Sequence, residues 1–351
     1  MEKVIPGYSR SAVERASKQI RKGIGSAVEL ENARAVLSEF RSAHAFPLNA
    51  VTVTVRQKAL TINGHAVIAQ RLKRLPTILD KLKRHPRMNV VTMQDLGGCR
   101  VIFPSLAEVD QLVRELRNAP RARNRIVRVY DYLRHDEEND RSGPKPSGYR
   151  GMHLTYEYRA SKKEYEGLRI ELQVRTQFQH AWATAVETMD LFSGSELKYS
   201  KGDLRVIRFF VVVSSLMAAE EHVAPVPGAE GSTRELTSEM RQLEDELGIV
   251  SRLRGYAAIV SNHATSDRRN ALTLELRRSA GNLTVTVHER MADAEARLAD
   301  LESLDDDDLD VVLVNIARIS QLQAAYPNYY ADTSIFTEFV TERLKASGRT
   351  S

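Results

Sequence analysis

The residues best suited to chemistry lie between positions 144 and 180. A glycine-rich, basic turn in this stretch contains Lys145 and Tyr149. Glycine lets a backbone approach a ligand closely, an aromatic ring can stack on a nucleobase, and a lysine can bind phosphate. A predicted strand at 168–175 carries one acidic residue, Glu171, among apolar neighbours. A carboxylate beside such a cluster indicates metal or proton chemistry on a phosphorylated substrate.

Two further blocks precede this stretch, so that four blocks follow one another in order. They read RLKRLPTILDKL at 71–82, MQDLGGCRVIF at 93–103, GYRGMH at 148–153 and ELQVRTQFQHAW at 171–182. Over roughly residues 50–190 they resemble the synthetase domain of the RelA/SpoT family of ATP-dependent pyrophosphokinases. The resemblance implies an α+β fold of the nucleotidyltransferase-like class, with a mixed β-sheet flanked by helices.

The resemblance also implies a role for individual residues. Asp95 and Glu171 would be catalytic and would hold Mg²⁺, which proteins commonly bind through one or two carboxylates together with substrate phosphates. Glu171 could in addition accept the proton of an attacking 3′-hydroxyl. The residues implied to bind ATP are Arg71, Lys73, Lys81 and Arg100. Those implied to bind the acceptor are Lys145, Tyr149, Arg150, His153, Gln173, Arg175 and His180.

Two of these assignments have plain structural alternatives. Asp95 could be a turn residue that bonds its own backbone, which is a common use of aspartate. A single histidine such as His180 would usually be structural, and it is the resemblance that supports a functional role. Trp182, the only tryptophan, is predicted to lie in the core.

The acceptor is left open by these residues. Housekeeping members of the family modify GDP or GTP, whereas a toxic branch modifies the 3′ end of tRNA, and both reactions use a ribose 3′-hydroxyl. A predicted helix at 8–24 carries five basic residues against one acidic residue, Glu14, which favours tRNA because Lys and Arg neutralise backbone phosphates. A solvated outer face is the alternative. The candidate tRNA contacts are Arg15, Lys18, Arg21 and Lys22.

Hydrophobic periodicity predicts the elements that position the site. The segment 50–60 is ambiguous, because its alternation suits a strand while its context suits a helix. The predicted helices of the first part are 8–24, 27–45, 77–85, 105–118, 177–189 and 204–221. Four strands are predicted. One follows the turn at 93–98, one spans 126–133, one follows the turn at 145–150 and one spans 168–175.

A segment rich in proline and glycine, 222–233, is predicted to link a catalytic domain at 1–221 to a regulatory domain at 234–351. The second domain is predicted to be a small α+β module. Its sequence carries no cluster of metal ligands, and the single cysteine, Cys99, lies in the first domain, so we expect no zinc finger. Its predicted elements are a helix at 234–260, a hairpin at 271–290, a helix at 290–303, a strand at 310–316 and helices at 318–325 and 334–346.

Tyr326 and Tyr329 form a YxxY motif in this second domain. The motif and the domain order resemble the CapRel group, single-chain toxin–antitoxin members of the RelA/SpoT family that act in phage defence. In that group such an element covers the ATP site. The resemblance implies that Tyr326 and Tyr329 are autoinhibitory and that a phage protein is the trigger. Tyrosines that anchor their own loop are the alternative.

The bulk composition excludes several classes of protein. The chain has 351 residues, of which 42% are hydrophobic and 28% charged, and its net charge of +5 favours an anionic partner only weakly. One cysteine excludes an internal disulfide and suits a reducing compartment. The start of the chain has no signal-peptide core, and the longest apolar run, 209–213, is too short to cross a bilayer. We therefore expect a cytoplasmic protein without membrane contact. We find no His-Asp pair of hydrolase type before residue 50.

Overall fold

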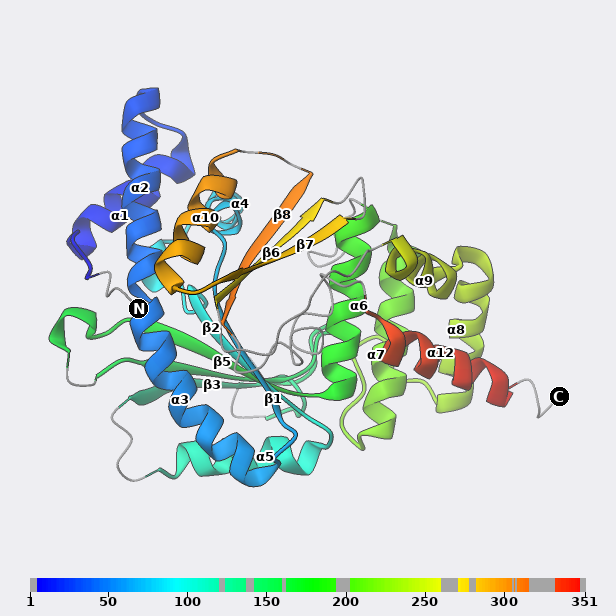
Figure 1. Ribbon diagram of the computed structural model, residues 1–351. Helices are drawn as coiled ribbons and strands as arrows, with labels where there is room; N and C mark the ends of the chain where they lie inside the picture. Colours follow the sequence, from blue (N-terminus) through cyan, green and yellow to red (C-terminus); the bar gives the residue numbers. More distant parts are fainter. Residues whose placement is uncertain are drawn as a thin grey trace.

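The fold is built on one mixed β-sheet flanked by helices, as predicted (Figure 1). In the part of the chain that the structure describes, eight strands follow the order β3-β4-β5-β2-β1-β8-β6-β7. The structure is a computed structural model, and it describes residues 5–119, 124–136, 142–159, 162–193, 203–259, 271–277, 282–304, 306, 308–315 and 332–347.

Five strands form the half of the sheet that carries the predicted site. β2 and β5 pair in parallel, and the remaining neighbours in this half pair antiparallel. The sequence pattern did not indicate β1, because its apolar start runs directly into the polar residues Gln70 and Arg71. The strands are β1 Val67–Leu72, β2 Gly97–Phe103, β3 Arg125–Asp131, β4 Met152–Glu157 and β5 Arg169–Thr176.

Two helices, α3 Ala45–Ile62 and α5 Leu106–Arg117, cover one face of this half of the sheet. The ambiguous segment 50–60 lies within α3 and is therefore helical. Its buried residues recur at helical spacing, at Leu48, Val51, Thr52, Val55 and Ala59, and tertiary packing on β1 and β2 overrides the local alternation. The predicted helix at 105–118 is confirmed as α5, with Ser105 in a capping box.

A second helical group lies beside the sheet at the start of the chain. The predicted helices 8–24, 27–45 and 77–85 are confirmed, and they share one apolar cluster. At the N-terminus of the first of these helices, the side chain of Ser9 accepts a hydrogen bond from the N–H of Ala12. Pro76 stands in the first turn of the third helix, where proline is tolerated. These helices are α1 Arg10–Lys22, α2 Ala27–Ala43 and α4 Leu75–Arg84, and short 3₁₀ turns lie at Val90–Thr92 and Lys163–Tyr165.

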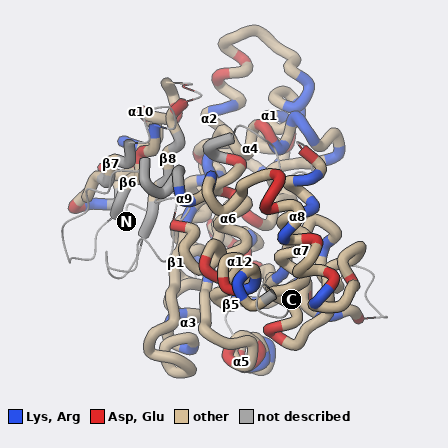
Figure 2. Tube along the Cα trace, turned by 90° about the vertical axis from the view of Figure 1, so that its right-hand side faces the viewer, with Lys and Arg blue, Asp and Glu red and all other residues tan. Residues whose placement is uncertain are grey.

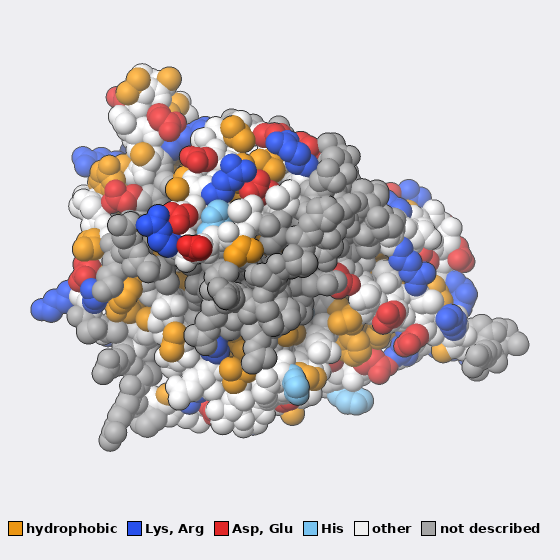
Figure 3. Space-filling view, in the orientation of Figure 1, with side chains coloured by type: hydrophobic (Ala, Val, Ile, Leu, Met, Phe, Trp, Pro, Cys, Tyr) orange, Lys and Arg blue, Asp and Glu red, His pale blue; other side chains and the backbone are white. Residues whose placement is uncertain are grey.

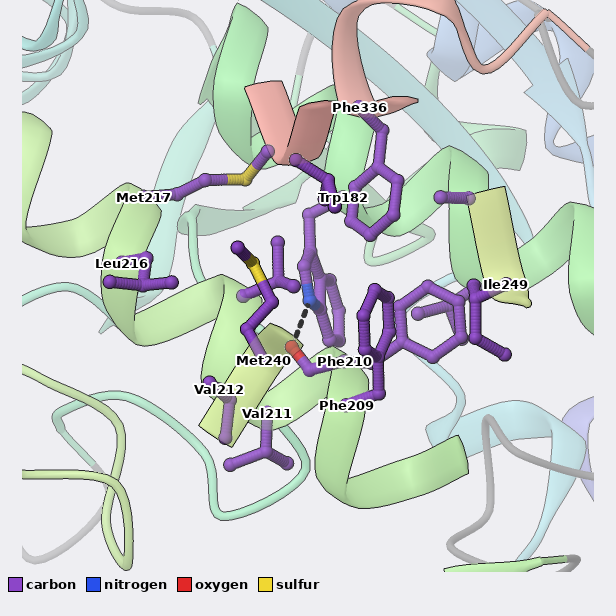
Figure 4. Close-up of a cluster of buried hydrophobic side chains, with 14 of the residues drawn as sticks. Trp182, Phe209, Phe210, Val211, Val212, Leu216, Met217, Met240, Ile249 and Phe336 are labelled. Carbon is purple, nitrogen blue, oxygen red and sulfur yellow. Dashed lines mark hydrogen bonds between the residues drawn. The ribbon is translucent and has the colours of Figure 1, made fainter. Parts of the chain in front are cut away.

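A third group of helices combines elements from both predicted domains. Figure 4 shows its core, where Trp182, Phe209, Phe210 and Phe336 pack together. The predicted linker 222–233 is irregular but packed, because Val226 is fully buried and its N–H donates to Ser215 Oγ. The helices of this group are α6 Gln177–Ser193, α7 Leu204–Glu220, α8 Thr233–Leu247, α9 Ile249–Ile259 and α12 Ser334–Ser347.

The prediction of one helix at 234–260 is wrong. Gly248 is the C-cap of α8, has a left-handed backbone with φ 60° and separates α8 from α9. Glycine is the residue most often found at this position, because it has no Cβ to clash. The break lets both helices pack on the same core as α6 and α7.

The last strands extend the same sheet. The hairpin is confirmed as β6 Ala271–Arg277 and β7 Asn282–His288, and β8 Leu309–Asn315 pairs with β6 and, at Gln70–Asn315, with β1. α10 Met291–Ser303 packs on Val311 and Leu313. The predicted helix at 318–325, Tyr326 and Tyr329 lie outside the described residues. None of the described helices is long and apolar enough to cross a membrane.

Candidate functional site

One cavity of about 410 Å³ collects most of the predicted site residues. Its walls come from β1, α4, β2, the turn at 145–149, β4, β5 and α6. Of the predicted residues it is lined by Arg71, Lys73, Lys81, Asp95, Arg100, Lys145, Tyr149, His153, Glu171, Gln173 and Arg175.

Strand register explains why residues distant in sequence meet here. Glu171, Gln173 and Arg175 alternate along β5 and share one face, while the intervening Ile170, Leu172 and Val174 face the core under α3 and α5. The parallel register sets Gly98 beside Glu171 and Arg100 beside Gln173. The antiparallel neighbours add Arg71 opposite Gly98 and His153 opposite Gln173.

The donor wall, which we define as Arg71, Lys73, Lys81, Asp95 and Arg100, is centred on Asp95. Lys73 Nζ and Lys81 Nζ each donate to Asp95 Oδ2 at 3.0 Å. Burial opposes ionisation of Asp95, but the two ammonium charges outweigh it and lower its pKa to about 2. Asp95 therefore binds two lysines rather than its own backbone. Asp95 Oδ1 is buried and has no hydrogen-bond partner in the described part of the chain.

The acceptor wall is a continuous network of hydrogen bonds among Tyr149, His153, Glu171, Gln173 and Arg175. His153 Nδ1 lies 3.1 Å from Glu171 Oε1, and Gln173 Nε2 donates to Glu171 Oε2 at 2.8 Å. Arg175 donates to Gln173 Oε1 at 3.0 Å and to the hydroxyl of Tyr149 at 2.6 Å, and that hydroxyl also contacts His153 Nε2. Burial opposes ionisation of Glu171, but His153 outweighs it, so the pKa of Glu171 is lowered.

Aromatic rings gather next to this network. Tyr132 meets the rings of Tyr149 and His153 edge-to-face, with centroids 5.9 and 5.2 Å apart. Lys145 Nζ lies 4.3 Å from the centre of the Tyr132 ring, and the Arg175 guanidinium lies 4.9 Å from that of Tyr149. Burial raises the pKa of Tyr132 to about 12. Tyr132 was missed by sequence reasoning, because it stands at the end of a strand without a motif.

Two predicted acceptor residues do not line the cavity. Arg150, the last residue of the turn, is 2% exposed and pairs with Glu221 Oε2 at 2.5 Å. The structure thus gives Arg150 a protein partner instead of the predicted phosphate. His180 is buried on α6 and is not among the residues that line the cavity.

The cavity also contains residues that the sequence reasoning did not assign to the site. On α4, Thr77 and Lys81 are four residues apart, so the helix presents them on one face. The same spacing relates Trp182 to Val186 on α6. The position of Lys81 could therefore have revealed Thr77. The additional lining residues are Ala69, Thr77, Arg84, His85, Gly98, Cys99, Ser147, Trp182, Ala183 and Val186. Glu187 also lines the cavity, at a position on α6 that the resemblance to the RelA/SpoT family matches.

The predicted tRNA contacts lie on α1, which is at the top of Figure 2. Arg15 and Lys18 line a groove between α1 and α2. Arg21 donates to the carbonyl oxygen of Met88 at 2.6 Å, so it also supports the fold. Charges of both signs are interspersed over the described residues that are visible in Figure 3.

The residues present fit a Mg²⁺ ion that is shared with substrate phosphates. Within the described ranges there is no cluster of three or more His, Cys, Asp or Glu side chains that could hold a metal alone. Asp95 and Glu171 supply two carboxylates to one cavity, and Asp95 Oδ1 is an unpaired oxygen. Two carboxylates completed by phosphates and water is the usual environment of Mg²⁺ in phosphoryl-transfer sites.

Comparison with known proteins gives a family match for residues 70–191, described as the region found in RelA / SpoT proteins. The chain is 26% identical over 175 residues to GTP pyrophosphokinase YwaC of Bacillus subtilis (strain 168), covering 45% of this chain and 78% of that protein. It is 25% identical over 199 residues to the uncharacterized protein Rv1366 of Mycobacterium tuberculosis (strain ATCC 25618 / H37Rv), covering 56% of this chain and 64% of that protein. The crystal structure of small alarmone synthetase 1 from Bacillus subtilis aligns with a TM-score of 0.38 at 21% identity, covering 60% of this chain and 94% of that structure.

Proposed function

We propose that this chain, whose residues 70–191 match the region found in RelA / SpoT proteins, is an ATP-dependent pyrophosphokinase. It would transfer pyrophosphate from ATP to a ribose 3′-hydroxyl. One observation carries the proposal: a single cavity joins Asp95, bound by two lysines, to Glu171, which is held in an aromatic and basic network. Phosphoryl transfer requires this combination of phosphate positioning, charge neutralisation and hydroxyl activation.

The donor wall would bind ATP. Arg71, Lys73, Lys81 and Arg100 supply positive charge to the triphosphate, and charge-assisted hydrogen bonds of this kind are among the strongest in proteins. Asp95 and Glu171 would hold Mg²⁺, which when bound neutralises charge that develops on the phosphates. The lowered pKa of Asp95 keeps its carboxylate ionised at neutral pH, as metal binding requires.

The acceptor wall would bind and activate the 3′-hydroxyl. The lowered pKa of Glu171 keeps it in the charged form that can accept a proton. His153 and Gln173 hold one oxygen of Glu171 each, which fixes the direction of the carboxylate. Tyr149 would stack the acceptor base on the face of its ring that Arg175 does not cover.

Two acceptors are supported by different observations. The basic residues of α1 favour the 3′ end of tRNA, since they could bind phosphates of a large substrate. The name of the Bacillus subtilis relative, GTP pyrophosphokinase, favours GDP or GTP. We propose tRNA as the acceptor, with translation as the inhibited process, and synthesis of (p)ppGpp as the alternative.

We further propose that the C-terminal part restrains the donor wall, as expected of a fused toxin–antitoxin in phage defence. Glu302 of α10 pairs with Arg41 at 3.1 Å, and both side chains are buried. Glu302 Oε1 also accepts a hydrogen bond of 3.1 Å from the N–H of Leu75, the first residue of α4, which carries Lys81. Release by a phage protein and inhibition by Tyr326 and Tyr329 belong to the same proposal and derive from the resemblance.

A label-transfer assay on the full chain tests the proposed function. Wild type and Glu302→Gln, which loosens the contact to α4, receive ATP labelled on the γ-phosphate, Mg²⁺ and GDP, GTP or deacylated tRNA. We expect label on one acceptor and none with Glu171→Gln. The absence of label on every acceptor for both folded proteins would contradict the proposal. A truncation at residue 221 is unsuitable, because it would remove α8 and α12 from a shared core.

A further inference from the structure

We infer that Glu221, next to the C-terminal end of α7, is a positioning residue that holds the turn 145–150, and with it Tyr149, at the cavity. Its role in acceptor binding rests on the proposed function, whereas its effect on the turn does not. Glu221 lies outside the family match at 70–191 and is not one of the site residues predicted from the sequence. It touches neither the cavity lining nor the reacting groups, so it would act through Arg150.

The carboxylate of Glu221 joins three elements. Its Oε2 accepts from Arg150 in the turn at 2.5 Å and from Gln179 of α6 at 3.2 Å. Its Oε1 accepts from the hydroxyl of Thr176 at the end of β5. The ion pair is almost completely buried, since the Arg150 and Glu221 side chains are 1% and 7% exposed. Glu221 therefore ties the turn to the strand that carries Glu171 and to the helix that carries Trp182.

Ser214 provides a second attachment of the same turn to α7. Arg150 Nε donates to Ser214 Oγ at 3.1 Å, and Ser214 Oγ donates to the carbonyl oxygen of Gly148 at 2.6 Å. Ser214 and Glu221 are seven residues apart, which places them two turns apart on one face of α7. Both sequence neighbours of Tyr149 are thus anchored, which leaves the Tyr149 ring directed at the opposite side, toward His153 and Arg175.

The turn is also tightly seated against α6. Gly148 has φ +92°, and a Cβ at this position would lie 2.6 Å from Trp182 Cζ2. The indole N–H of Trp182 is fixed by a hydrogen bond of 2.7 Å to the Phe210 carbonyl (Figure 4). The turn consequently has little freedom to shift while it remains attached to α7.

The net stability from a buried ion pair is small, because desolvation offsets the attraction, but removal of one partner leaves an uncompensated buried charge. If Glu221 loses its charge, the buried guanidinium of Arg150 keeps its positive charge without a counterion. The simplest relief is movement of the turn toward solvent, which displaces Tyr149. A small misplacement of a substrate-positioning group can reduce turnover strongly, even when the chemistry lies elsewhere.

The test compares full-length Glu221→Gln and Ser214→Ala with wild type and with a matched control, Glu239→Gln. Glu239 lies on α8 and pairs with Arg208 of α7 at 2.6 Å. It contacts neither the turn nor the cavity. Ser214→Ala removes one attachment without leaving a buried charge, so it remains informative if Glu221→Gln folds poorly. The readouts are KM for ATP, KM for the acceptor, and acrylamide quenching of the fluorescence of Trp182, the only tryptophan.

We expect KM for the acceptor to rise about tenfold in Glu221→Gln and about threefold in Ser214→Ala, while KM for ATP stays within about twofold. Quenching of Trp182 should increase in both variants and remain at the wild-type level in Glu239→Gln. Equal rises of both KM values, or unchanged quenching in folded Glu221→Gln and Ser214→Ala, would overturn the inference. If wild type transfers label to no acceptor, the proposed function fails, and Trp182 quenching alone still decides whether Glu221 positions the turn.

Discussion

The two walls of the cavity are held in different ways. On the donor wall, Lys73 and Lys81 converge on one oxygen of Asp95, and the three side chains are 20–30% exposed. On the acceptor wall, each oxygen of Glu171 has its own partner, and the bonds continue through His153 to Tyr149. Two lysines that share one oxygen and remain partly solvated exchange partners easily, whereas a network in which each carboxylate oxygen has its own partner favours one geometry. The donor wall is therefore built to rearrange around phosphates, and the acceptor wall is built to keep its shape.

The anchors of the two walls differ as well. The donor wall is attached through α4 to Glu302, which belongs to the C-terminal part of the chain. The acceptor wall is attached through Arg150 to Glu221, next to the C-terminal end of α7. Both anchors are buried ion pairs, but they hold opposite sides of the cavity. A change in the C-terminal part should thus affect the donor wall before it affects the acceptor wall.

The largest effect is expected for Glu171→Gln, which keeps the shape of the side chain but removes the proposed base and proposed metal ligand. We expect kcat to fall by about a thousandfold, within the range of general base catalysis. Steady-state kinetics with both substrates saturating measure it. Glu157→Gln is the control, because Glu157 pairs with Arg159 away from the cavity. Turnover of Glu171→Gln near the wild-type rate would remove Glu171 from the chemistry.

Tyr149→Ala should affect the acceptor wall alone. Loss of a base-stacking platform is expected to lower kcat/KM for the acceptor by about 10- to 100-fold, in line with about 1–3 kcal/mol per stacked base. KM for ATP should change little. Tyr149→Phe keeps the ring and loses only the hydroxyl contacts to His153 and Arg175, so it should retain most of the acceptor affinity. Equal losses in the two variants would show that the ring does not stack.

Acid should loosen the donor wall through Asp95. The folded-state pKa of about 2 lies below the ordinary value of 3.8, so the folded protein binds protons less readily than the unfolded chain. The resulting stabilisation of about 2 kcal/mol is present above pH 4 and is lost as pH falls toward 2. Urea unfolding of wild type and Asp95→Asn at pH 5 and pH 2.5 measures it. A difference between the two proteins that does not shrink with acid would contradict this electrostatic arrangement.

Glu302→Gln should have the smallest effect and should act on the opposite wall from Glu221→Gln. Release of α4 is expected to change KM for ATP by about fivefold, a typical size for coupling between sites. KM for the acceptor should stay at the wild-type value. Titration of each substrate at a saturating level of the other separates the two. A change in the acceptor KM alone would reverse the assignment of anchors to walls.

Residues that alternate along a strand or share a helical face could be predicted from the sequence. Glu171, Gln173 and Arg175 form such a set, and the register of β5 with β2 and β4 then brings in Arg100 and His153. Contacts between distant segments could not be predicted in the same way. Arg150 looks like a phosphate ligand in a basic turn, and its partner in the structure, Glu221, is 71 residues away, next to the end of a helix without a site motif.

The same limit explains the differences in fold. The alternation at 50–60 suits two structures, and packing on the sheet selects the helix. The segment 222–233 has the composition of a linker, yet Val226 is buried in a core that α7, α8 and α12 share. Gly248 could have been recognised as a helix end, because glycine is the usual C-cap, whereas the pairing of β8 with β1 has no local signal.

The most direct measurement is the stoichiometry of the reaction with a chemically defined acceptor. Full-length protein is incubated with ATP, Mg²⁺ and either the acceptor identified by label transfer or its 3′-deoxy analogue. We expect one AMP for each acceptor that gains two phosphates, and no product with the 3′-deoxy analogue. Formation of ADP, or transfer to the 3′-deoxy analogue, would contradict pyrophosphoryl transfer to a ribose 3′-hydroxyl.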